Sequence, residues 1–553
     1  MAPKCRRVAV LGAGVAGLAA IKTCLEEGME VVAFESRPCV GGLWSGQKDE
    51  WSSTGPSMYR SLLSNTSKSM TSFSDFPCPA SYPPFLPHNV FRDYLCLYAK
   101  HFQLGKYIQL NTRVLKVMRS EDHASSGKWR LTLSTRLQPE GGEGDSSGRD
   151  KVWEEEFDGV IVASGFYSKA KSPDYPGLHT AFPGSVSHSC HYVEGSPYQD
   201  KTVLVVGQAN SAFDIAVDLS NWAKQVYLSV GDGVCVQSRV DASSGLPFDL
   251  SLIRALYYWL SSVQIFRLIG WLANRRCNHR TLGLEYTGNL SWPIVVNDEI
   301  QQRILAGKVK ILRHLSEFTD SGVITADGRL IEGIDHVIFA TGYDRDFSVL
   351  DESLNLNGEK LELYKQVFPV HEKHHTLALL GCVRVAGPMP PAIELMARMA
   401  AYTLSGRHKL PAADVMKADS DRYNKIALKA DGKYRYAFVN LMIYEEIASE
   451  IGVAPSFWRL LFSGKPKLAF KIFFGPALPY IYRLVGPGAW QGAEAAMDKA
   501  IEENLLPLQN RTLVQKPQEG KSCQAFNMLR FFIMLSFIGF AAFWLCGLFL
   551  THV

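Results

Sequence analysis

The sequence contains no pair of cysteines in the C-x-x-C spacing, although eleven cysteines are spread along its 553 residues. Structural zinc sites and thioredoxin-type redox disulfides use that spacing, so we expect no metal site and reduced thiols, as in the cytosol. A charge bias is also missing, because 58 lysines and arginines are balanced by 54 aspartates and glutamates. Without a broad positive field, we expect no nucleic-acid partner.

The stretch VAVLGAGVAGLAA at residues 8–20 reads as a buried strand, a glycine turn and the start of a helix. Gly12, Gly14 and Gly17 fall in the G-x-G-x-x-G spacing, which brings backbone and the amide groups of a helix N-terminus to a pyrophosphate. A second apolar strand from Met29 ends at Glu35, near the separation of about 20 residues at which an acid meets a ribose hydroxyl. This pattern predicts a dinucleotide fold, and it excludes a cleaved signal peptide.

A second fold of this kind is predicted from KTVLVVGQANSAFDIAVDLS, which starts at Lys201. Gly207 turns the strand, but Ala209 and Ala212 stand where the second and third glycines would be, and an alanine methyl keeps backbone away from a pyrophosphate. A nicotinamide site and a scaffold without nucleotide therefore both remain open. The chain is long enough for two domains, or for one domain with a large insertion.

Residues 59–76 carry many hydroxyls and one amide, Asn65, among apolar positions. Asn65 and Thr66 could contact a cofactor, or they could only form a turn or a helix cap. Trp44, in VGGLWSG, could likewise close over a cofactor or pack in the core.

Residues 531–550, FFIMLSFIGFAAFWLCGLFL, contain no charge and have the length that crosses a bilayer as a helix. Arg530 precedes them, so the positive-inside rule predicts a cytosolic body. Whether this segment spans the bilayer or lies in the interface stays open. The apolar residues of 251–272 predict a membrane-facing or substrate-access helix.

The chain resembles the flavin-containing monooxygenases of the vertebrate microsomal, dimethylaniline N-oxide-forming type. FPGSVSHSCHY at 182–192 supplies Phe182, Gly184, His188 and Tyr192 at the positions F-x-G-x-x-x-H-x-x-x-Y. The segments GAGVAGL, VGGLW, SNTSKSM, VNDE, FATGY and FFGPALPYIYRLVGPGAW are also similar, and the match runs essentially end to end.

The resemblance implies an α/β fold with two Rossmann-like domains, for FAD and NADP, the second inserted in the first, plus a C-terminal membrane helix. We expect residues 1–168 and 336–510 in the FAD-binding part, 169–335 in the NADP-binding domain with a membrane or access insertion near 240–290, and 526–553 as the anchor. The implied location is the endoplasmic reticulum membrane.

The implied chemistry uses FAD and NADPH: reduced flavin captures molecular oxygen as a C4a-hydroperoxide, which oxygenates nitrogen or sulfur of small lipophilic compounds. Such chemistry needs no catalytic triad, because the cofactor carries it. Asn65 is the expected catalytic residue. The positions implied for FAD are Gly12, Ala13, Gly14, Val15, Ala16, Gly17, Glu35, Leu43, Trp44, Asn65 and Thr66. Those implied for NADP are Ser64, Asn65, Gly207, Asn210, Ser211, Ala212 and Phe213.

One departure concerns coenzyme preference. The family pattern has an arginine for the 2′-phosphate after the strand that follows the second nucleotide helix, whereas this chain reads LSVGDGVCVQSR from Leu228. Arg239 and Lys224 are the nearest alternatives, and Asp232 would repel a phosphate. Carbonyl oxygen insertion, a peroxide-producing NADPH oxidase and a membrane flavoprotein with an impaired NADP site remain alternative functions. The expected partners are substrate, oxygen and a lipid bilayer, and a homo-oligomer is left open.

Overall fold

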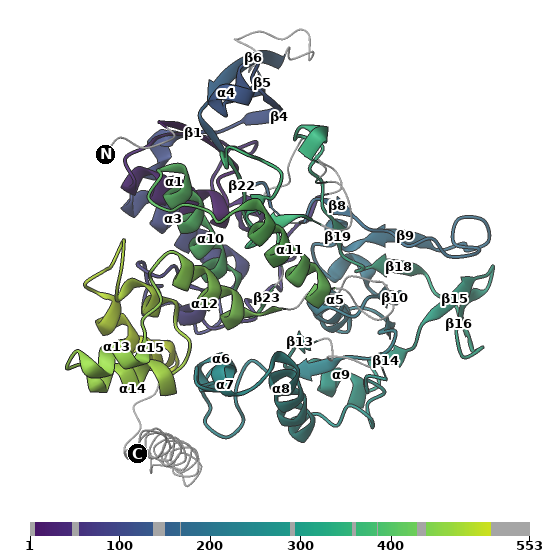
Figure 1. The fold of residues 1–553 in the computed structure, drawn as a ribbon. Coiled ribbons are helices and arrows are strands. Elements are labelled where there is room, and N and C mark those ends of the chain that lie inside the picture. Colours follow the sequence, from purple (N-terminus) through teal and green to yellow (C-terminus); the bar gives the residue numbers. More distant parts are fainter. Residues whose placement is uncertain are drawn as a thin grey trace.

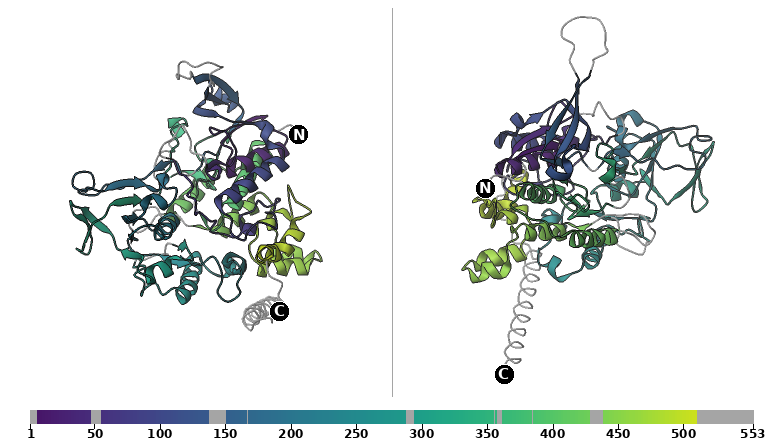
Figure 2. Two further views of the ribbon diagram at one scale, coloured as in Figure 1. Left: turned by 180° about the vertical axis from the view of Figure 1, so that it is seen from behind. Right: turned by 45° about the horizontal axis from the view of Figure 1, so that its top comes forward.

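The computed structural model describes residues 6–46, 55–136, 150–165, 167–287, 294–354, 356, 361–383, 385–427 and 438–509. Figure 1 shows two α/β units, one around β1 and one around β10, with the C-terminal helices α13 to α15 packed against the first. Figure 2 shows the same arrangement from behind and from above.

The first sheet has five parallel strands in the order β22-β7-β1-β2-β3. Their bounds are β1 Arg7–Leu11, β2 Glu30–Phe34, β3 Ile108–Gln109, β7 Gly159–Val162 and β22 Leu377–Leu379. Helices α1 (Val15–Glu26) and α10 (Met389–Leu404) pack on each other and contribute to one buried apolar cluster with this sheet. Strand β22 comes from the chain beyond the second sheet, so the second unit is inserted in the first.

The second sheet also has five parallel strands, in the order β14-β11-β10-β18-β9. Their bounds are β9 Ser185–His188, β10 Thr202–Val206, β11 Gln225–Ser229, β14 Val309–Leu312 and β18 His336–Phe339. Helix α5 (Asn210–Leu219) follows β10 directly. The boundary expected after residue 335 would cut off β18, which hydrogen-bonds to β10, so the second unit extends at least to Phe339.

Smaller sheets and helices complete the units. Two antiparallel sheets contain β4 Thr112–Arg119, β5 Trp129–Arg136 and β6 Asp150–Phe157, and β15 Leu315–Phe318, β16 Gly322–Thr325 and β17 Leu330–Glu332. A parallel pair is formed by β12 Cys235–Gln237 and β13 Ile294–Val296. The further helices used below are α2 Lys68–Thr71, α3 His88–His101, α13 Phe457–Phe462, α14 Pro466–Phe474 and α15 Ala493–Leu505.

The apolar segment 251–272 is broken, and the prediction of one helix there is wrong. It contains the end of α6 (Phe248–Ser251), then α7 (Leu256–Trp259) and most of α8 (Ser262–Arg276). The break before α8 is a capping box, in which Ser261 and Gln264 satisfy each other's backbone amides. The S-x-x-Q spacing of these residues is a sequence signal for a helix start that hydrophobicity alone does not register.

The described helices include none that is both long and apolar enough to cross a membrane. The predicted anchor, residues 526–553, lies outside the described residues.

Candidate functional site

The first glycine turn connects β1 to α1 through close backbone contacts. Gly12 has φ +105° and donates its N–H to Phe34 O at 2.8 Å. A Cβ at Gly12 would lie 2.6 Å from Ala163 O, and one at Gly17 would lie 1.9 Å from Gly12 O. A Cβ at Gly14 would come closest to Gly42 Cα, at 3.3 Å, with Gly42 N and Gly41 C at 3.7 and 4.0 Å. Packing within the chain therefore requires glycine at 12 and 17, whereas Gly14 keeps half-exposed backbone clear.

Two segments lie against this turn. Glu35, immediately after β2, is buried and accepts hydrogen bonds from Ala13 N at 2.7 Å and Arg37 N at 3.0 Å. A carboxylate can accept about four hydrogen bonds, so capacity for a ribose hydroxyl remains. Gly41 N donates to Ala13 O at 2.9 Å, which places the VGGLW loop across the turn. This cradle of bare backbone beside an acid fits the pyrophosphate and ribose of FAD.

Trp44 and Leu43 of the VGGLW loop are both half-buried. The Trp44 ring packs edge-on against Phe91 of α3, with ring centroids 4.6 Å apart. The structure therefore gives Trp44 a packing contact, and its contact with a cofactor stays a prediction.

The second turn repeats the first despite its missing glycines. Gly207 N donates to Ser229 O at 3.0 Å. A Cβ at Gly207 would lie 2.5 Å from Ala340 O, just as a Cβ at Gly12 would lie 2.6 Å from Ala163 O in the first turn. Ala212 is fully buried, and its methyl would lie 3.0 Å from a Cβ at Gly207. Because Gly207 has no side chain, the turn has room for alanine at position 212. Gly207 itself is half-exposed, and the turn keeps accessible backbone for a dinucleotide.

The residues predicted to bind NADP at α5 divide into two groups. Ala212 and Phe213 belong to the core of the second unit, so only their backbone could face a nucleotide. Asn210 and Ser211 are half-buried, and Asn210 Oδ1 accepts from Val296 N at 2.8 Å. That hydrogen bond ties the start of α5 to the end of β13.

The edge where a 2′-phosphate would bind carries an aspartate in contact with a histidine. Val230 occupies the position after β11 that Glu35 occupies after β2, and it is buried. Asp232 lies two residues further, with Oδ1 3.1 Å from Nε2 of His314, which follows β14 at the same edge. Of the two alternatives for the missing arginine, Lys224 precedes β11 at the wrong end of the strand.

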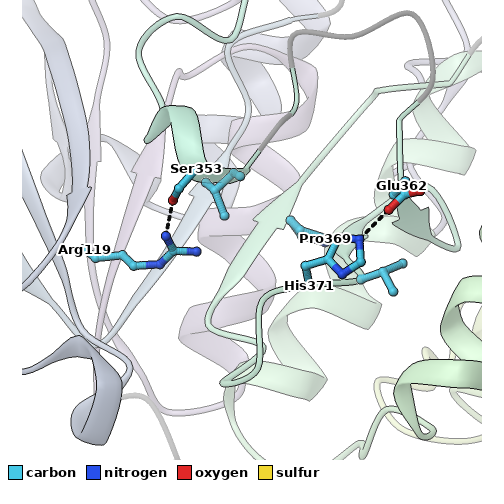
Figure 3. Close-up of a pocket in the computed structure, with 7 residues that line it drawn as sticks. Arg119, Ser353, Glu362, Pro369 and His371 are labelled. Carbon is cyan, nitrogen blue, oxygen red and sulfur yellow. Dashed lines mark hydrogen bonds and ion pairs between the residues drawn. The ribbon is translucent and has the colours of Figure 1, made fainter.

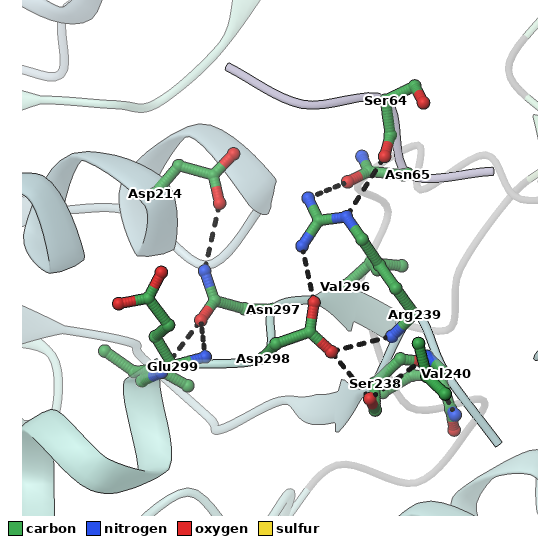
Figure 4. Close-up of polar contacts among 12 residues, drawn as sticks. Ser64, Asn65, Asp214, Ser238, Arg239, Val240, Val296, Asn297, Asp298 and Glu299 are labelled. Atoms are coloured by element: carbon green, nitrogen blue, oxygen red, sulfur yellow. Dashed lines mark hydrogen bonds and ion pairs between the residues drawn. The ribbon is translucent and has the colours of Figure 1, made fainter. Parts of the chain in front are cut away.

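The other alternative, Arg239, is 8% exposed and bonds elsewhere. Its guanidinium donates to Ser64 O at 3.0 Å and to Asn65 Oδ1 at 3.1 Å, and it pairs with Asp298 Oδ2 at 3.0 Å (Figure 4). The structure thus brings Ser64 and Asn65, from the first unit, against the second. Arg239 is not available to a 2′-phosphate.

Sequence reasoning missed two half-buried acids near these residues. Asp214 of α5 accepts from Tyr59 Oη at 2.7 Å and from Asn297 Nδ2 at 3.0 Å, and burial raises its pKa. Asp249 accepts from Ser67 N at 2.7 Å, and burial raises its pKa to about 6. Asn297 lies in the VNDE segment, whose sequence gives no sign of its contact with Asp214. Contacts between residues more than 80 positions apart leave no local pattern to find.

His188 has the structural role expected from its place between the units. It is buried, its Nδ1 accepts from Cys190 N at 3.2 Å, and its Nε2 lies 3.1 Å from Gly342 O. Burial lowers its pKa. Both ring nitrogens are engaged by backbone of this chain, so His188 is not a base at the turns.

A separate pocket of about 170 Å³ lies between β4 and residues 353–371 (Figure 3). Arg119 hydrogen-bonds Ser353 on one side, and His371 Nε2 lies 2.5 Å from Glu362 Oε2 on the other. None of its lining residues belongs to either glycine turn, so this pocket is not part of the candidate site.

Two parallel α/β units of the dinucleotide-binding type, one inserted in the other, with the intact turn and acid in the first, define the class of proteins built to hold two dinucleotides. The flavin-binding monooxygenase-like family model matches residues 5–545. Rabbit dimethylaniline monooxygenase [N-oxide-forming] 2 is 38% identical over 519 residues, which cover 92% of this chain and 94% of that protein. Rat flavin-containing monooxygenase 3 is 37% identical over 524 residues, which cover 93% of this chain and 95% of that protein.

The chain belongs to the flavin-binding monooxygenase-like family, as the resemblance of its motifs indicated. It is an FAD-dependent monooxygenase whose cofactors are FAD and NADPH. Among solved structures, garlic S-allyl-L-cysteine S-oxygenase has a TM-score of 0.60 at 21% identity, covering 90% of this chain and 99% of that one. Cyclohexanone monooxygenase from Rhodococcus sp. Phi1, bound to NADP⁺, has a TM-score of 0.56 at 17% identity, covering 81% and 97%. These likenesses establish the α/β fold with its parallel cores.

Proposed function

We propose that this enzyme oxygenates soft nucleophilic nitrogen or sulfur atoms of small lipophilic compounds, with NADPH as reductant and molecular oxygen as oxidant. The observation that carries the proposal is the relationship to N-oxide-forming dimethylaniline monooxygenases at 38% identity over 92% of the chain. The meeting of Asn65 with the second unit supports it, because both cofactors have to come together there.

The proposed FAD site is the first turn. Gly12 to Gly17 would hold the pyrophosphate on bare backbone, Glu35 would accept from a ribose hydroxyl, and Leu43 and Trp44 would lie beside it. NADPH would bind the second turn through Gly207 and the start of α5 at Asn210. When bound, FAD takes hydride from NADPH and activates oxygen, one atom of which goes to the substrate.

Asn65 is the proposed catalytic side chain. It is half-buried between the units, and a side-chain amide offers both a donor and an acceptor to groups at the reacting centre. Thr66, beside it, shares a hydrogen bond with Thr71 of α2 at 2.8 Å, which fixes the segment that carries Asn65. A fixed amide in a site that excludes water is how a protein without its own nucleophile assists cofactor chemistry.

The test compares products across three substrate classes with purified enzyme. A tertiary amine such as dimethylaniline, a thioether and a cyclic ketone are each supplied with NADPH and oxygen, while NADPH consumption and hydrogen peroxide are followed. We expect N-oxide and sulfoxide, with little ester from the ketone. Ester as the main product would support carbonyl oxygen insertion, and peroxide in amounts equal to NADPH consumed with every substrate would support an NADPH oxidase.

We further propose attachment to the endoplasmic reticulum membrane through the single C-terminal segment 531–550, with the catalytic body in the cytosol. Exposed aromatic side chains on α7, α8 and α13 support a membrane-facing surface, and they include Trp458 at 50% and Phe462 at 81% exposure. Helix α7 packs on α14 through Trp259 and Phe473, whose ring centroids are 5.8 Å apart, so α7 and α14 form one apolar region.

A further inference from the structure

Arg239 stands at the junction of the two units because of the pairing of β12 with β13. These strands are parallel, so the residues that follow them leave at the same edge, and Arg239 and Asp298 each come two residues after their strand. Asp298 Oδ1 accepts from Arg239 N at 3.0 Å and from Ser238 Oγ at 2.6 Å, in addition to the ion pair. The Arg239 guanidinium is therefore held by the Asp298 carboxylate, which is itself fixed by hydrogen bonds from Ser238 Oγ and Arg239 N.

The Asp298 carboxylate is stabilised in its charged form. Burial acts to raise the pKa of Asp298, but hydrogen bonds from Ser238 and Arg239 outweigh it, and the pKa lies below its ordinary value. A paired aspartate at this place keeps Arg239 in one rotamer with its remaining N–H groups directed at Ser64 O and Asn65 Oδ1 (Figure 4). Arginine's planar fork can meet several acceptors at once, which lysine's single ammonium cannot do in the same directions.

The chemistry of the guanidinium decides the orientation of the Asn65 amide. Arginine has five donors and no acceptor, so only the amide oxygen can face it. The Nδ2 group is thereby turned the other way, and among the described residues no hydrogen bond uses it. A hydrogen bond to a charged donor biases such a choice by roughly tenfold or more over the flipped amide.

We propose that Arg239 is a positioning residue that fixes the side-chain amide of Asn65 so that its N–H groups face the bound cofactors. This inference rests on the proposed role of Asn65. Arg239 contributes to oxygenation through Asn65, and it leaves the glycine turns and hydride transfer untouched. Losing Arg239 would let the amide rotate and present its oxygen where its donor is needed.

The variants are Arg239→Lys, Arg239→Met, Asn65→Ala and the double variant Asn65→Ala/Arg239→Lys, each as full-length holoenzyme. Arg276→Met is the matched control, because exposed Arg276 bonds Ser238 and Val240 O in the same cluster without reaching Asn65. Arg239→Lys keeps the charge beside Asp298, so it addresses the orientation of the amide even where Arg239→Met fails to fold.

Two readouts are taken. The first is the product formed per NADPH consumed, together with peroxide. We expect Arg239→Lys to lower this ratio by about threefold or more, Arg276→Met to leave it unchanged, and the double variant to match Asn65→Ala alone, as two residues acting through one contact must. The second, independent of turnover, is the visible absorbance of the oxidised bound flavin with NADP⁺. There Arg239→Lys and Asn65→Ala should give the same difference spectrum and Arg276→Met none.

The outcomes separate the two claims. If Asn65→Ala lowers the ratio while Arg239→Lys leaves both ratio and spectrum at wild-type values, the positioning role is wrong and the role of Asn65 stands. Losses that add in the double variant would likewise overturn it, because Arg239 would then act independently of Asn65. An unchanged ratio and spectrum in Asn65→Ala would overturn both.

Discussion

Replacing Gly14 and Gly17 by alanine in turn should separate binding of FAD from folding of the first unit. At Gly17 a Cβ would stand 1.9 Å from Gly12 O, and real Cβ atoms essentially never come within 3.0 Å of another heavy atom. Helix α1 would have to move away from β1 by about 1 Å to relieve this contact, and overpacking of that kind costs about 1–3 kcal/mol or more. The residues at stake on α1 are fully buried, including Leu18 and Ile21.

At Gly14 the same methyl has room. Its Cβ would stand 3.3 Å from Gly42 Cα, so a shift of a few tenths of an ångström in the VGGLW loop suffices, and φ −80° with ψ −164° is open to alanine. The methyl would, however, occupy the half-exposed space proposed for the pyrophosphate. We expect Gly14→Ala to fold normally and to bind FAD at least about tenfold more weakly, a loss of ~1.4 kcal/mol, and Gly14→Val to lose FAD altogether.

The assay measures the ratio of FAD to protein by absorbance, the affinity of the stripped protein for added FAD, and the thermal unfolding of both forms. Gly17→Ala should lower the unfolding temperature of the FAD-free protein, whereas Gly14→Ala should lower only the stabilisation that FAD adds. Wild-type FAD affinity in Gly14→Val would refute the assignment of the first turn. A destabilised FAD-free Gly14→Ala would refute the distinction between the two glycines.

Three further predictions concern coenzyme, pH and membrane. Asp232→Arg should raise the preference for NADPH over NADH by roughly tenfold, since it replaces an acid by a bidentate phosphate partner; kcat/KM for both coenzymes checks this, and an unchanged ratio would place the 2′-phosphate elsewhere. Asp249→Asn should unfold at a higher temperature than wild type at pH 8 but not at pH 4. Burial raises the Asp249 pKa from 3.8 to about 6, so its stabilisation is present below the unfolded value and is lost as pH rises through 6; an equal gain at both pH values in detergent solution would contradict the burial. Removal of residues 526–553 should release most protein from membranes with its FAD retained, and a truncated protein that stays bound would show that α7, α8 and α13 suffice for attachment.

Local patterns in the sequence predicted the strands, turns and helices whose formation depends on neighbouring residues. Alternation of apolar strand, glycine turn and helix indicated β1 with α1 and β10 with α5, because the close contacts at Gly12, Gly17 and Gly207 admit few other residues. The parallel cores and the FAD and NADPH dependence are confirmed. The place of β22 in the first sheet depends on pairing with β7 across more than 200 residues, and the inserted unit was expected only from the family resemblance.

The candidate site was less predictable where it depends on long-range contacts. Asn65 could be singled out by its polar surroundings in the sequence, but its partner Arg239 lies 174 positions away and was considered for a phosphate instead. Asp249 lies in α6, just before the segment 251–272 whose apolar residues indicated one long helix, and the Ser261 capping box breaks that segment. Charge and polarity along the chain did not reveal which buried groups meet, because burial is decided by the packing of the two units.

Comparison of the two turns explains why the glycine motif alone says little about coenzyme choice. In both, the amide after the strand donates across to the neighbouring strand, Gly12 to Phe34 and Gly207 to Ser229. The residue that follows the accepting strand is Glu35 after Phe34 and Val230 after Ser229. The second turn therefore has no acid at the position where Glu35 could bind a ribose hydroxyl. Selection at the second site therefore passes to residues beyond the motif, at the ends of β11 and β14. There Asp232 Oδ1 lies 3.1 Å from His314 Nε2, and a 2′-phosphate bound at this edge would meet that carboxylate.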